Sequence, residues 1–126
     1  MKMAANIGAW MQRIIEMDNT ISAITVIDLN GAILWQTNNW DLSADIPGIM
    51  QVWQGGGGGG SLNIQGIKYV ILNAEPERIV ARNMQGQGNI VLMKTGNGAI
   101  IAYVSPEGEP RSALTTMIEA TRGFQL

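Results

Sequence analysis

Apolar residues recur at helical spacing near both ends of the chain. In residues 7–17 they form one stripe, which consists of Ile7, Trp10, Ile14 and Met17. A later segment begins at Ser112, a candidate N-cap, and stops at Gly123. Leu114, Met117, Ile118 and Thr121 lie along one side of it. The spacing therefore predicts one helix near each end.

Between these helices the apolar residues follow strand patterns. Residues 21–29 are rich in β-branched side chains, and Asn30-Gly31 separates them from residues 32–37, which predicts an antiparallel hairpin. Ser43 is a candidate N-cap for a short helix with Pro47 in its first turn and an apolar side of Ile49, Met50 and Trp53. Further on, residues 61–66 predict a short edge strand, and residues 67–73, 78–84, 89–95 and 99–105 predict an antiparallel meander.

This order of elements predicts an α+β fold. We expect a central antiparallel sheet of about six to seven strands, with the N- and C-terminal helices side by side on one face and the short helix elsewhere. No repeat or change of composition divides the chain, so residues 1–126 are predicted to form one domain. Residues 1–8 are expected to be a flexible extension before the first helix.

A run of six glycines, Gly55–Gly60, raises the question of phosphate binding. A phosphate-binding glycine loop leads from a strand directly into a helix, whose N-terminus helps to hold the anion. Here the run follows a predicted helix and precedes a predicted strand, and Lys68 lies too far along for a Walker A arrangement. The run is therefore interpreted as a flexible spacer, either natural or engineered.

The amino-acid composition excludes several classes of binding and catalytic site. The net charge of −2 includes no basic stripe, which argues against nucleic-acid binding, and no apolar stretch is long enough to span a membrane. The absence of Cys and His excludes disulfides and removes the commonest general base and metal ligand. The close acidic pairs, Glu75 with Glu77 and Glu107 with Glu109, flank prolines in predicted turns and are interpreted as solvated. We therefore expect a cytoplasmic protein that is not an enzyme and needs no cofactor.

The positions of the aromatic residues indicate a candidate binding surface more clearly than the charged residues do. Trp10 lies on the first predicted helix, Trp35 on the second strand, Trp40 just beyond it, and Phe124 at the end of the last helix. Each could simply cover the core. Together they could instead form an aromatic groove between the terminal helices and the second strand, which is the kind of surface that binds polyproline II peptides.

Several motifs resemble the profilin family over nearly the whole chain. They are IGAW in the first helix, NGAILWQ in the hairpin, PGIM in the second helix, and GIKYVILN, GNIVLMKTG and AIIAYV before the last helix. The resemblance implies a small, monomeric, non-enzymatic protein of the cytoskeleton that binds monomeric actin. It also implies binding of proline-rich segments and phosphoinositide lipids.

The resemblance also implies the positions of the binding residues. Those for actin are Lys68, Val70, Leu72, Asn73, Arg82, Met84, Asn89, Thr115, Thr116 and Glu119. Those for polyproline are Trp10, Trp35 and Phe124, and the groove is expected to be weakened because Arg13 and Ile14 stand where the family has a second aromatic residue. Lipid binding would rest on Lys68, Arg82 and Lys94, so it is expected to be weak.

These departures suggest a divergent archaeal profilin of the Asgard type. The main alternative is a roadblock/LC7-type domain, a dimeric scaffold for small GTPases with a similar order of elements. It leaves no natural place for the strand at residues 78–84. A third class, a small-molecule sensor of the PAS type, would need a polar pocket that the sequence does not indicate.

Overall fold

The computed structural model describes residues 2–55 and 60–124, with only the backbone given for residues 2–5. Their elements are α1 (Lys2–Met17), β1 (Ile21–Asp28), β2 (Ile33–Gln36), α2 (Ile46–Gln54), β3 (Ser61–Ile64), β4 (Ile67–Glu75), β5 (Arg78–Arg82), β6 (Asn89–Thr95), β7 (Gly98–Val104) and α3 (Pro110–Ala120). The seven strands form one antiparallel sheet in the order β2-β1-β7-β6-β5-β4-β3. The predicted α+β class, the hairpin and the meander are confirmed, and so is the edge strand predicted at residues 61–66, which forms at Ser61–Ile64.

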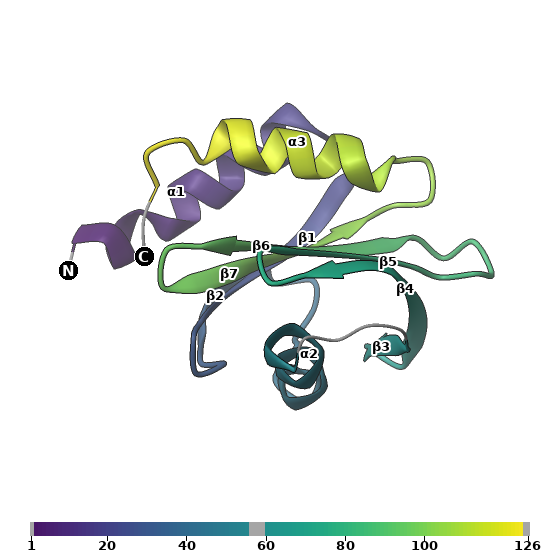
Figure 1. The fold of residues 1–126 in the computed structure, drawn as a ribbon. Coiled ribbons are helices and arrows are strands. Elements are labelled where there is room, and N and C mark those ends of the chain that lie inside the picture. Colours follow the sequence, from purple (N-terminus) through teal and green to yellow (C-terminus); the bar gives the residue numbers. More distant parts are fainter. Residues whose placement is uncertain (1, 56–59, 125–126) are drawn as a thin grey trace.

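The terminal helices α1 and α3 lie together on one face of the sheet, and α2 lies on the other (Figure 1). We call these the helix face and the α2 face. On the helix face, Ile7, Met11 and Ile14 of α1 are fully buried against the sheet and α3. Met11 belongs to this buried stripe, whereas Met17 is 52% exposed, so the predicted stripe was wrong at its last position. None of the described helices is long and apolar enough to cross a lipid bilayer.

A second apolar core fills the α2 face. Ile49 and Trp53 of α2 pack with Leu62, Tyr69 and other apolar residues beneath the sheet. The indole N–H of Trp53 donates a hydrogen bond of 2.9 Å to the carbonyl of Pro76, so its polar atom is satisfied. The sheet is therefore buried on both faces, which explains the nearly continuous apolar runs in β6 and β7.

The helix starts differ from those predicted. Glu109, not Ser112, caps α3, because its carboxylate accepts hydrogen bonds from the backbone N–H groups of Arg111 (2.9 Å) and Ser112 (3.1 Å). Ser43 does not cap α2 either, since its hydroxyl and its N–H both donate to Asp41 in a turn before the helix. Pro47 does lie in the first turn of α2, as predicted.

α1 begins at Lys2, earlier than predicted. The segment before Ile7 contains good helix formers and no residue that would stop a helix, so the helix extends back through it. The flexibility expected for residues 1–8 stays a prediction. The expectation of a mobile Gly55–Gly60 loop falls mainly on residues 56–59, which lie outside the described residues.

Candidate functional site

Two adjoining hollows lie between β5 and α3 and share Asn73, Val80 and Arg111. We call them together the β5–α3 groove. It is lined by Leu72, Asn73, Arg78, Val80, Arg82, Glu109, Pro110, Arg111, Leu114, Thr115 and Ile118. Four of the predicted actin-binding residues therefore meet here: Leu72, Asn73, Arg82 and Thr115.

A β-bulge in β4 brings Leu72 and Asn73 to the groove together. Ile71 pairs with Ala81 and Asn73 pairs with Val80, so Leu72 is the extra residue. Strict alternation along β4 would place neighbouring side chains on opposite faces. The bulge shifts this alternation, and as a result Leu72 and Asn73 line the same hollow.

Arg82 is the best positioned cation of this surface. Its Nε donates a hydrogen bond of 3.2 Å to Oδ1 of Asn89, its neighbour across the β5–β6 ladder. Asn89 is only 3% exposed, so this acceptor is shielded from water. Among the described residues, the two terminal nitrogens of Arg82 have no hydrogen-bond or ion-pair partner. The guanidinium is therefore held at one edge and free to bind a carboxylate at the other.

Further cations surround Arg82. Arg78 and Arg111 line the groove, and Lys68 lies on the same face of β4 as Val70, which pairs with Arg82. Within the part of the chain that the structure describes, none of these three side chains has an ion-pair partner. Among the described residues that line the groove, Glu109 is the single acidic one, and its carboxylate already caps α3. The surface thus presents unpaired positive charge to a partner.

Exposed apolar side chains adjoin these charges. Leu72 is 52% exposed, Met84 is 67% exposed, and Ile118 is 39% exposed. Val70 is half-buried beside them and lines a neighbouring hollow with Lys68 and Met84. Exposed apolar groups next to arginine are typical of a protein-binding surface.

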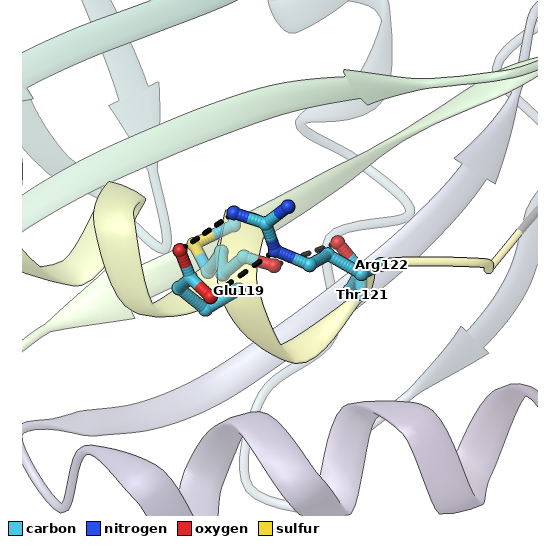
Figure 2. Close-up of polar contacts among 4 residues, drawn as sticks. Glu119, Thr121 and Arg122 are labelled. Atoms are coloured by element: carbon cyan, nitrogen blue, oxygen red, sulfur yellow. Dashed lines mark hydrogen bonds and ion pairs between the residues drawn. The ribbon is translucent and has the colours of Figure 1, made fainter.

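The remaining predicted residues of α3 lie apart from the groove. Thr116 is half-buried, and neither it nor Glu119 lines either hollow. Glu119 is paired with Arg122, whose Nη2 lies 2.8 Å from its carboxylate, while the Thr121 hydroxyl donates to the carbonyl of Met117 (Figure 2). The hydrogen bond from Arg122 lowers the pKa of Glu119, so this carboxylate is ionised and already occupied.

The three predicted polyproline residues gather on the helix face. The rings of Trp10 and Phe124 are 5.5 Å apart and inclined at 49°, and Trp35 packs against the same core. Trp35 lies close to α1, because a Cβ added at Gly8 would be 3.1 Å from its indole nitrogen. Trp40 does not join them, since it packs in the core of the α2 face and donates to the carbonyl of Ile24.

The structure does not bring Lys94 together with Lys68 and Arg82. Lys94, near the end of β6, lines a different hollow with Arg78, Met93 and Ile118, and neither Lys68 nor Arg82 lines that hollow. The Lys94 ammonium instead donates to the carbonyl of Gly96 at 3.0 Å.

The family model for profilin matches residues 8–122. The chain belongs to the profilin family. It is 34% identical to Loki profilin-2 of Lokiarchaeum sp. (strain GC14_75) over 125 residues, which is 93% of each chain. It is 35% identical to Odin profilin of Odinarchaeota yellowstonii (strain LCB_4) over 103 residues, covering 81% of this chain and 83% of that protein. A solved LokiProfilin2/Rabbit Actin Complex contains a chain that superimposes with a TM-score of 0.85 at 32% identity, with 94% of both chains covered.

These relatives confirm the profilin family and its Asgard archaeal branch, and the roadblock/LC7 alternative is not favoured. The strand β5, which the roadblock arrangement could not place, lies inside the sheet between β4 and β6. Sequence reasoning missed Arg78, Arg111 and Ile118. Arg111 and Ile118, at i and i+7 with Thr115 between them, form one side of α3, and this spacing could have identified them.

Proposed function

We propose that this chain binds monomeric actin through the β5–α3 groove and the adjoining surface of Lys68, Val70 and Met84. The observation that carries the proposal is the likeness to the profilin chain of an actin complex, together with the unpaired cations on this face. Covering one end of an actin monomer would slow spontaneous nucleation and so regulate polymerisation. Because actin is the partner, we also infer a cytoplasmic, cytoskeletal location.

Each part of the surface has a distinct physical role. Leu72, Met84 and Ile118 supply apolar area, which drives association. Arg82 and Arg111 supply charge-assisted hydrogen bonds to acidic groups of actin, which fix orientation. Because Arg82 is already held by Asn89, it loses less side-chain freedom on binding than a free arginine would.

The test is a pyrene-actin assembly assay with rising concentrations of the protein. We expect wild type to lengthen the lag phase. Arg82→Glu should relieve this inhibition, with a loss of affinity of about 30-fold or more, as for an arginine hot spot. Arg13→Glu is the matched control, because it makes the same charge change on α1 beside Trp10, away from the groove. Equal effects of the two variants would refute the placement of the site, and no inhibition by wild type would refute the function.

A second proposal is that the aromatic cluster of Trp10, Trp35 and Phe124 binds proline-rich peptides. It is supported by the indole N–H groups of Trp10 and Trp35, for which the described residues supply no acceptor, whereas those of Trp40 and Trp53 are hydrogen-bonded. Free N–H donors beside apolar rings suit the exposed carbonyls of a polyproline helix.

A decaproline peptide titrated against tryptophan fluorescence tests this. Trp35→Phe keeps an aromatic ring but removes the donor, so it should weaken binding. Trp40→Phe, on the other face, should leave binding unchanged. If both variants bind like wild type, the donor has no role.

A further inference from the structure

The β5–β6 loop, residues 83–88, is held by one buried amide. Asn83 is 7% exposed. Its Oδ1 accepts hydrogen bonds from the backbone N–H groups of Gln85 (2.9 Å) and Gln87 (3.0 Å), and its Nδ2 donates to the carbonyl of Lys68 (2.9 Å). One side chain therefore fixes the loop internally and ties it to β4.

A second contact holds the far end of the loop. The Tyr103 hydroxyl donates to the carbonyl of Gln87 at 2.8 Å, and the Asn83 N–H donates to the carbonyl of Gly88 at 2.9 Å. Gly88 lies directly against the Tyr103 ring, since a Cβ there would be 2.6 Å from it. The loop is thus fastened to β4 at one end and to β7 at the other.

The side chain that this loop displays is Met84. It is 67% exposed, the highest value among the exposed large apolar residues of the described chain. Met84 lies between two hollows, one lined by Arg82 and Asn89 and the other by Lys68 and Val70. A partner side chain seated in either hollow would contact it.

We propose that Asn83 is a positioning residue for partner binding. By fixing the loop backbone, it places Met84 between the two hollows before the partner binds. The role rests on the proposed function, because the partner is the actin monomer. The Met84 side chain has flexible torsions that can adapt to a partner, so the fixed loop backbone sets only where this side chain starts. Because the loop is ordered before binding, association does not incur the loss of conformational entropy that ordering a mobile loop would require.

A double-mutant cycle in actin affinity tests the proposal. Asn83→Ala should weaken binding about tenfold, because it frees the loop. In a Met84→Ala background, which lacks the displayed side chain, Asn83→Ala should weaken binding by less than about threefold. The same factor in both backgrounds would overturn the proposal, because Asn83 would then act only through general stability. Tyr103→Phe removes the other fastening while keeping the ring, and it should show the same dependence on Met84 if Asn83→Ala proves too unstable to measure.

Hydrogen exchange separates failure of this role from failure of the proposed function. In the free protein we expect slow exchange at the amides of Gln85 and Gln87, and exchange at least about tenfold faster in Asn83→Ala. Unchanged exchange would overturn the positioning role even where actin binds. If the exchange rates are as expected but the wild-type protein does not bind actin, the proposed function is refuted. The role of Asn83 in actin binding is then refuted with it, although the loop is fixed as described.

Discussion

Gly88 offers a sharp test of how the β5–β6 loop is built. Its φ is +111°, and an added Cβ would lie 2.6 Å from both Cε1 and the hydroxyl oxygen of Tyr103. Gly88→Ala should therefore lower the free energy of unfolding for two separate reasons. The backbone conformation costs about 1–3 kcal/mol for a residue with a side chain, and the overpacking against the ring costs about 1–3 kcal/mol more.

Gly86→Ala is the matched control in the same loop. Gly86 also has a positive φ, of +82°, but nothing lies within 4 Å of its Cβ position. This variant should lower the free energy of unfolding by the backbone penalty alone, about 1 kcal/mol. Gly88→Ala should lower it by about 3 kcal/mol, which corresponds to a fall in Tm of about 10 °C for a domain of this size.

Urea unfolding followed by tryptophan fluorescence measures both variants. Repeating them in a Tyr103→Ala background isolates the ring contact, since the cost of Gly88→Ala should then fall to that of Gly86→Ala. Equal costs for the two glycine variants in the wild-type background would show that the Tyr103 ring moves aside freely. The reasoning about a fixed loop would then be refuted.

Three further predictions concern other parts of the molecule. Met117→Ala, at a fully buried position of α3, should lower the free energy of unfolding in urea by about 3 kcal/mol, whereas a loss under about 1 kcal/mol would contradict the packing described. The Arg13 guanidinium lies 5.9 Å from the Trp10 ring centroid, so Arg13→Ala should uncover that ring and tighten decaproline binding in a fluorescence titration; weaker binding would show that Arg13 assists it. Burial raises the pKa of Tyr69 from 10.0 to about 12, so the free energy of unfolding should hold below pH 10 and fall as the pH rises toward 12. Tyr69→Phe should lessen that fall in urea titrations, and an unchanged slope would assign it to other groups.

Much of the fold follows from local pattern. β-branched runs and short turns predicted the strands and their antiparallel order, because hairpin connections leave little choice of neighbour. Helix starts were less predictable. Ser43 and Ser112 are typical caps, yet Asp41 takes the hydrogen bonds of Ser43, and Glu109 with Pro110 begins α3 earlier. Local hydrogen bonds made by Asp41 and Glu109, rather than the general preference of serine for the N-cap, set these two positions.

The binding surface was only partly predictable for a different reason. Alternation in β4 groups Lys68, Val70 and Leu72, but the bulge that adds Asn73 to the groove depends on the register with β5. Arg111 joins the groove because α3 packs over β6, next to β5, which no local pattern specifies. The role of Asn83 depends on hydrogen bonds to residues up to fifteen positions away.

The position of β7 in the sheet determines how late in synthesis on the ribosome the sheet can be completed. β7 is the last strand to be synthesised, yet it lies between β1 and β6 and joins the early hairpin to the later meander, with Ile21 opposite Val104. Until β7 emerges, the strands form two groups that are not hydrogen-bonded to each other, β1–β2 and β3–β6. The buried residues of α1 also lack the β7 residues that pack against them in the folded protein. The sheet can therefore be completed only late in synthesis, and in a chain stalled before Gly98 the edges of β1 and β6 that β7 covers would be unpaired and prone to pair with other chains.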